Sequence, residues 1–160
     1  MDIRERSFYL WEESLEWHVL EYPYHQGIQK WVKDLNRLYR TEPALYELDF
    51  GLEGFEWIDF RDSEHSIISF IRKGRSTSDI IFIVCNFTPV PTNNYRVGVP
   101  RVGFWKEVLN SDAEIYGGSG YGNLGGVEAT PIPAHGRYYS LSLTLPPLGV
   151  LFFKSEGNNR

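Results

Sequence analysis

Cysteine is nearly absent from this sequence of 160 residues, because Cys85 is the only one. A single cysteine excludes a disulfide within the chain, which fits the reducing environment of the cytoplasm. The first six residues are mostly charged and lack the apolar core of a secretory signal peptide. We therefore expect a cytoplasmic protein.

Long apolar runs are also missing, since no window approaches the roughly 18 uncharged residues that a membrane span needs. Lysine and arginine are scattered and the formal net charge is −5, so the basic stripe typical of nucleic-acid-binding proteins is absent. Hydrophobic residues make up 42% of the chain and aromatic residues 16%, which indicates a packed core rather than disorder. The length suits one domain, or one domain with an appendage.

The clearest helical pattern covers residues 26–40. Apolar side chains recur there at steps of three and four residues, at Ile28, Trp31, Val32, Leu35, Leu38 and Tyr39. Arg37 and Arg40 lie in the last turn, where the helix dipole favours cations. Pro43 prevents the helix from continuing, so we predict one α-helix over residues 26–40.

After the helix the apolar pattern changes to a period of two, which is typical of β-strands. Residues 80–87 are continuously apolar up to Cys85 and rich in β-branched side chains, which predicts a central strand buried on both faces. The expected strands are residues 55–60, 66–73, 80–87, 95–99, 104–109, 127–132, 140–145 and 150–154. So many short strands separated by turn residues predict a sandwich or a barrel. A lone helix before a complete β domain looks like the tail of a preceding domain.

Two motifs with possible chemistry favour structural interpretations. Residues 120–125 match G-x-G-x-x-G, but the following residues do not form a helix, so we predict a flexible surface loop and no nucleotide cofactor. Asp59, Asp62, Glu64 and His65 are metal-ligand types without the spacing of a standard site. We interpret them as a solvated turn between two strands and expect no metal.

Aromatic and acidic side chains suggest weaker candidates. The flat faces of Trp57, Trp105 and Tyr121 are candidates for stacking on sugar rings, although for Trp57 and Trp105 we favour the interpretation that they fill the core or a domain interface. Sugar chemistry needs two carboxyl groups roughly 5–9 Å apart in a cleft. The acids of the N-terminal stretch qualify by residue type alone: Glu12, Glu13, Glu16 and Glu21.

Several segments are far more specific when taken together. In their order and spacing they resemble the C-terminal end of bacterial glycogen (1,4-α-glucan) branching enzymes, and the likeness runs from about Glu12 to Phe153. The segments are residues 14–20, 27–29, 32–40, 43–45, 47–50, 54–58, 85–91, 95–100, 109–112, 116–120, 135–137 and 140–148. The family usually has Asp where this chain has Glu16, and residues 1–10 do not resemble it.

The resemblance implies an architecture. These enzymes belong to the α-amylase superfamily, in which a (β/α)8 catalytic barrel precedes an all-β C-terminal domain of antiparallel β-sandwich type. Residues 26–40 would then be the last barrel helix, residues 1–43 the tail of the barrel, and residues 44–160 the C-terminal domain. Glu16 and Trp17 would lie in the loop after the last barrel strand, at the rim of the glucan cleft in the intact enzyme.

The resemblance also implies a function in glycogen biosynthesis. The family is a class of glycosyltransferases that cleave α-1,4 linkages and form α-1,6 branches along a retaining path. The catalytic carboxylates belong to earlier barrel strands and are absent here, so we expect a non-catalytic piece that supports the missing barrel. The alternative is a glucan-binding module that uses exposed Trp57, Trp105 or Tyr121. The partners expected are glycogen or another α-glucan, the barrel and, through exposed Trp17 and Trp31, a second copy of the chain.

Overall fold

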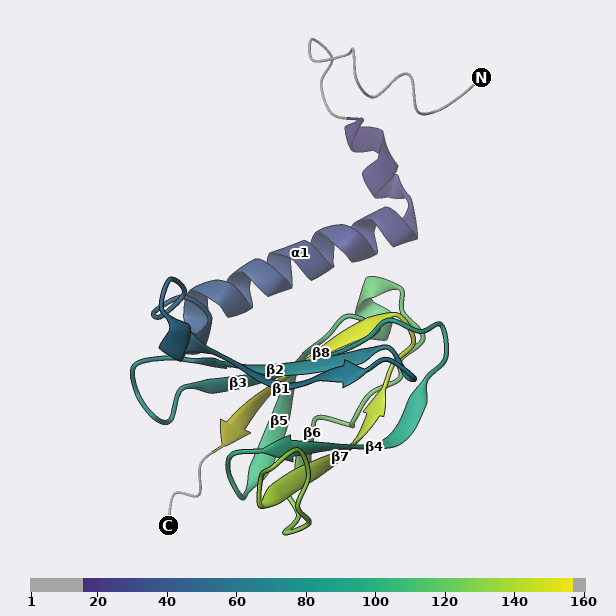
Figure 1. Ribbon diagram of the computed structural model, residues 1–160. Coiled ribbons are helices and arrows are strands. Elements are labelled where there is room, and N and C mark those ends of the chain that lie inside the picture. The colour runs from purple at the N-terminus through teal and green to yellow at the C-terminus, as the bar shows by residue number, and fades with distance from the viewer. Residues whose placement is uncertain (1–15, 157–160) are drawn as a thin grey trace.

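The computed structural model describes residues 16–156, which form one helix followed by two antiparallel β-sheets (Figure 1). The helical elements are η1 (Trp17–Glu21), α1 (Pro23–Thr41), η2 (Pro43–Leu45), η3 (Leu52–Gly54) and η4 (Glu114–Tyr116). The strands are β1 (Phe55–Asp62), β2 (Ile67–Lys73), β3 (Ile80–Asn86), β4 (Thr92–Val99), β5 (Phe104–Asn110), β6 (Gly126–Glu128), β7 (Tyr139–Leu145) and β8 (Gly149–Glu156). The predicted fold class, mainly antiparallel β after one helix, is confirmed.

The larger sheet has six strands in the order β1-β2-β3-β8-β5-β6, and β4 and β7 form a second sheet. Every second side chain along the strands points into the space between the two sheets. Phe82, Trp105 and Phe153 are the largest side chains buried there. β3 is buried on both faces, as its apolar run predicted. Phe82 and Val84 face the second sheet, while Ile81 and Ile83 face the opposite side.

Helix α1 covers the outer face of the six-stranded sheet (Figure 1). Leu38 is buried there, and Trp31 and Leu35 pack against the same apolar cluster, which includes Ile81 and Ile83 of β3. The helix is longer than predicted at its start, because Pro23 occupies the first turn, where its fixed φ is favourable. The apolar period in the sequence begins only at Ile28, so it did not reveal the first turn of the helix.

The segment after β6 differs from the prediction. Residues 127–132 were expected as a strand, but β6 ends at Glu128. Beyond it, Thr130 forms only an isolated bridge to Ser140. The apolar residues of this stretch therefore do not extend the sheet.

The start of α1 is held against η4. Trp31 meets the ring of Tyr116 edge to face at 5.4 Å, and the Tyr116 hydroxyl donates a hydrogen bond of 2.7 Å to Asp34 Oδ2. Burial and this bond to Asp34 raise the pKa of Tyr116 to about 12, so it remains a donor. Trp31 was expected to be exposed, and this expectation is wrong because η4 covers its ring.

Gly27 allows this close approach. A methyl group at position 27 would overlap the backbone carbonyl of Tyr116.

No helix in residues 16–156 is long and apolar enough to cross a membrane.

We predict that Gly27→Ala destabilises the protein by about 1–3 kcal/mol, the range for overpacking at a rigid contact. Helix propensity alone predicts the opposite sign, since alanine is favoured over glycine by about 1 kcal/mol. Urea unfolding measures the difference, with Asn36→Ala on the exposed side of α1 as the matched control. A Gly27→Ala variant as stable as Asn36→Ala would contradict the proposed contact.

Candidate functional site

β1 is one of the two edge strands of the six-stranded sheet, because in the described part of the chain it pairs with β2 alone. Its register against β2 shifts twice, between Trp57 and Asp59 and again between Asp59 and Asp62. Such bulges change which way the side chains point along a strand. Strict alternation therefore fails along β1.

Aromatic rings gather on this edge. We call Phe55, Trp57 and Phe60 the aromatic platform; Trp57 lies 4.9 Å from Phe55 and 5.5 Å from Phe60 between ring centroids. Phe70 of β2 lies beneath them, stacked on Phe55 at 5.2 Å. Trp57 is 46% exposed, and all three platform residues are exposed. The platform thus presents flat apolar rings to solvent on a sheet edge.

A hollow of about 260 Å³ lies beside the platform. Its lining combines rings with charged groups: Trp57, Ile58, Asp59, Phe60, Arg61 and His135. The Arg61 guanidinium lies 5.5 Å from the centre of the Phe60 ring, a cation–π distance. Apolar rings beside hydrogen-bonding groups are the usual composition of a small-molecule site.

Three carboxylates follow one another at three-residue steps along β1, and we call Glu56, Asp59 and Asp62 the carboxylate row. Each contacts a residue outside the six-stranded sheet. Glu56 pairs with Arg137, and Asp59 Oδ2 lies 3.5 Å from His135 Nε2, both in the segment between β6 and β7. Asp62 Oδ2 accepts a 3.2 Å hydrogen bond from the Tyr95 hydroxyl of β4. The row therefore ties the platform strand to the second sheet.

The surroundings of Glu56 and Asp62 keep these two acids charged. Burial alone would raise the pKa of Glu56, but Lys73 and Arg137 outweigh it and hold the pKa below its ordinary 4.5. Burial of Asp62 is likewise outweighed by hydrogen bonds from His65 and Tyr95, so its pKa lies below 3.8. Burial and the adjacent Asp62 raise the pKa of Tyr95, which remains protonated and donates.

The acidic turn of the sequence has two parts. Glu64 and His65 are exposed, as predicted for a solvated turn. Asp59 and Asp62 instead belong to strand β1, where Asp59 contacts His135 and Asp62 accepts the hydrogen bond from Tyr95. Among residues 16–156, no three His, Cys, Asp or Glu side chains converge as a metal site. Cys85 is partly buried and its pKa is raised by burial to about 11, which keeps it a thiol.

Trp105 must be removed from the candidate contacts. Its side chain is fully buried against Phe82, and its indole nitrogen donates to the Arg101 carbonyl at 3.3 Å. The alternation of β5 points it into the space between the sheets. The position of Trp105 therefore supports the interpretation that it is a core residue.

Tyr121 lies apart from the platform, in the loop between η4 and β6. Asp112 holds this loop, accepting hydrogen bonds from the backbone N–H groups of Ser119 at 2.9 Å and Tyr121 at 3.2 Å. Strand β6 follows the glycines rather than a helix, so the loop lacks the structure of a dinucleotide-binding turn. Tyr121 is exposed, and it does not line the hollow beside the platform.

Glu16 is the N-cap of η1 and Trp17 is its first residue, so both precede the start of α1 (Figure 1). Both are exposed, and the structure does not bring them to the platform. Glu12 and Glu13 lie outside the described residues. No pair of these acids is therefore identified as catalytic.

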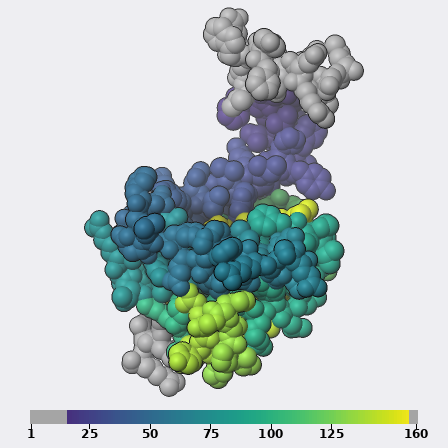
Figure 2. All heavy atoms as spheres, viewed as in Figure 1, coloured from purple at the N-terminus to yellow at the C-terminus, as the bar shows by residue number. Residues whose placement is uncertain are grey.

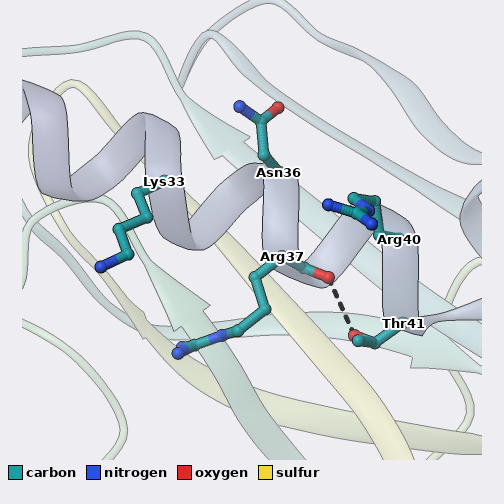
Figure 3. A pocket seen from close by; sticks show the side chains of 5 residues that line it. All are labelled: Lys33, Asn36, Arg37, Arg40 and Thr41. Carbon is teal, nitrogen blue, oxygen red and sulfur yellow. Dashed lines mark hydrogen bonds between the residues drawn. The ribbon is translucent and has the colours of Figure 1, made fainter.

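The free side of α1 carries a basic hollow of about 480 Å³ (Figure 3). It is lined by Lys33, Asn36, Arg37, Arg40 and Thr41. The Thr41 hydroxyl donates to the Arg37 carbonyl at 3.0 Å, and Arg37 also pairs with Asp34 at 3.0 Å. All five lining residues come from one helix, so this hollow is a groove on a convex surface.

Comparison with known proteins adds a family. Residues 57–156 match the family described as alpha amylase, C-terminal all-beta domain. The chain is 64% identical over 146 residues to the 1,4-alpha-glucan branching enzyme GlgB of Aquifex aeolicus, covering 91% of this chain and 23% of that protein. It is 59% identical over 152 residues to the enzyme of that name from Aromatoleum aromaticum, covering 95% and 24%. The chain spans about a quarter of these relatives, and the predicted resemblance is confirmed.

We predict that His65 gives the protein a stability that depends on pH. The hydrogen bond to Asp62, 2.9 Å from His65 Nδ1, raises the pKa of His65 above 6.5. Its contribution is therefore complete below pH 6.5 and is lost as pH rises through the folded-state pKa. The contributions of Glu56 and Asp62, whose pKa values are lowered, are instead lost as pH falls below 4.5 and 3.8.

Melting temperatures measured across this range test the prediction. His65→Asn should remove part of the decline above pH 6.5, whereas His18→Asn, at another exposed histidine, should leave the decline unchanged. An equally steep decline in His65→Asn and in the unmodified chain would show that the pair with Asp62 does not contribute.

Proposed function

Because the chain belongs to the alpha amylase C-terminal all-beta domain family, we propose that it is the non-catalytic C-terminal part of a 1,4-α-glucan branching enzyme. In this proposal its task is to support the catalytic barrel of the enzyme. The similarity to branching enzymes across nine-tenths of the chain supports the assignment. Residues 1–43 would belong to the barrel and residues 44–160 to the C-terminal domain.

The observation that carries this proposal is a second apolar stripe on α1. Trp31, Leu35 and Leu38 face the sheet, but Ile28, Val32 and Tyr39 follow each other at helical spacing on an adjacent side. These three side chains are 62%, 47% and 46% exposed. A surface helix of one domain needs a single apolar stripe, so the second stripe indicates a further partner.

We assign that partner to the barrel, because α1 contains residues 26–40, which the resemblance assigns to the last barrel helix. The relatives are roughly four times as long as the part that this chain matches. The missing part would supply the apolar surface for Ile28, Val32 and Tyr39. The same part would hold the catalytic carboxylates, and we assign no catalytic residue to this chain. Under this proposal the whole enzyme acts in glycogen biosynthesis in the cytoplasm.

A chimera tests the supporting role. The chain replaces the matching segment of the Aquifex aeolicus relative, and branching of amylose is measured. We expect an active chimera, and we expect Ile28→Glu with Val32→Glu to reduce active enzyme at least about tenfold, because two charges would be buried at the contact. Lys33→Glu on the polar side is the matched control. A fully active double variant would contradict the docking of α1 on the barrel.

A second function is favoured by the exposed platform. Glucosyl rings present an apolar C–H face that stacks on flat aromatic side chains, and Trp57 offers such a face beside a polar hollow. We therefore propose that β1 also binds glycogen or another α-1,4-glucan. Tyr121 remains a lesser candidate, since its ring is exposed but does not line the hollow beside the platform.

Retardation in native gels containing glycogen tests the second function. Trp57→Ala should weaken retardation at least about tenfold, the usual loss when a central aromatic contact is truncated. Tyr121→Ala serves as a matched exposed-aromatic comparison and should have the smaller effect. Equal melting temperatures of the variants guard against misfolding. Unchanged retardation of Trp57→Ala would contradict binding at the platform.

A further inference from the structure

The hollow beside the platform has a polar wall opposite its rings. Asp59 forms part of this wall from β1, and His135 reaches it from the segment between β6 and β7. Figure 2 shows the yellow-green part of the chain, which contains this segment, lying against the teal β1 region on the face in view. The side chains of Asp59 and His135 retain 18% and 27% exposure, so both are within reach of a ligand.

Hydrogen bonding determines which nitrogen of His135 carries a proton. The backbone N–H of Gly98 donates to Nδ1 at 3.2 Å, so Nδ1 is the acceptor and the neutral ring carries its proton on Nε2. Nε2 and Asp59 Oδ2 are 3.5 Å apart, beyond a normal hydrogen bond. Asp59 Oδ1 already accepts the Arg61 N–H at 2.9 Å. A donor and an acceptor therefore lie side by side in the hollow, and neither makes a normal hydrogen bond within the described residues.

We propose that Asp59 and His135 bind the two neighbouring hydroxyls, at C2 and C3, of a glucosyl ring that stacks on Trp57. One hydroxyl donates to Asp59 Oδ2 and the other accepts from Nε2–H. In an α-1,4-glucan these are the adjacent free hydroxyls, whereas the 6-hydroxyl stands alone. The site therefore recognises glucosyl units, interior ones included, through these two hydroxyls and leaves the 6-position free. This inference rests on the proposed glucan binding at the platform.

The polar wall is built rather than incidental. His135 has a left-handed backbone with φ 48°, a conformation that costs energy for residues other than glycine. Reciprocal backbone hydrogen bonds between Ala134 and Arg137, at 3.1 and 2.9 Å, close the turn around it. Arg137 in turn pairs with Glu56 of the carboxylate row. The imidazole is thus positioned before any ligand arrives, which reduces the entropy lost on binding.

Two substitutions test the wall. His135→Asn keeps an acceptor near Nδ1 and tolerates the left-handed backbone, but it removes the Nε2 donor. Asp59→Asn keeps an oxygen for the Arg61 N–H and replaces the free acceptor. Each should weaken maltoheptaose binding in calorimetry by about tenfold, the worth of one hydrogen bond involving a charged or desolvated group.

His65→Asn is the matched control, because His65 also pairs with a β1 carboxylate but does not line the hollow. It should bind within about twofold of the unmodified chain. If His135→Asn and Asp59→Asn bind as His65→Asn does while Trp57→Ala does not bind, the polar wall is overturned and the platform stands. If Trp57→Ala binds as well as the unmodified chain, the proposed glucan-binding function is overturned as well.

Modified ligands give a test that does not depend on the folding of variants. β-Cyclodextrin methylated at every 2- and 3-hydroxyl should lose about tenfold in affinity, whereas β-cyclodextrin methylated at every 6-hydroxyl should retain it. Equal affinity of the two methylated rings would overturn the assignment of the 2- and 3-hydroxyls.

Discussion

β3 carries apolar side chains on both of its faces, and the whole arrangement depends on covering both. Phe82 and Val84 need the second sheet, and Ile81 and Ile83 need a helix. An exposed apolar face of this size would cost several kcal/mol at about 25 cal/mol per Å². The requirement explains why a lone helix stays attached to a β domain: α1 covers a sheet face that would otherwise be exposed.

The attachment of α1 has a consequence for the larger protein. Its contact with η4 through Gly27 and Tyr116 sets how the helix lies on the sheet. That orientation leaves Ile28 and Val32 turned away from the domain. One apolar side of α1 thus packs on the sheet, and the adjacent apolar side is available to the proposed barrel. In this proposal the helix would join the two domains rigidly.

A different constraint applies to β1, an edge strand of the six-stranded sheet. An unpaired edge strand invites pairing with other chains, and bulges, charges and covering segments prevent it. β1 has two register shifts and three carboxylates, and each carboxylate contacts a residue outside its sheet. These same features place Trp57, Asp59 and His135 around one hollow. Protection of the edge and formation of the candidate site therefore arise from the same residues.

The amino-acid pattern by itself predicted the helix and most of the strands, because periods of 3.6 and two reflect burial that neighbouring residues share. The order and spacing of its segments carried the resemblance to the family. The pattern could not separate Trp57 from Trp105, since both are tryptophans in strands and only the pairing of strands makes one an exposed edge residue and the other core. Nor did it connect Asp59 with His135, which lie 76 positions apart (135 − 59) and meet only through the turn that Arg137 anchors to Glu56. Local periodicity is a short-range property, whereas a site is made by contacts between distant segments, and these exist only once the two sheets have packed.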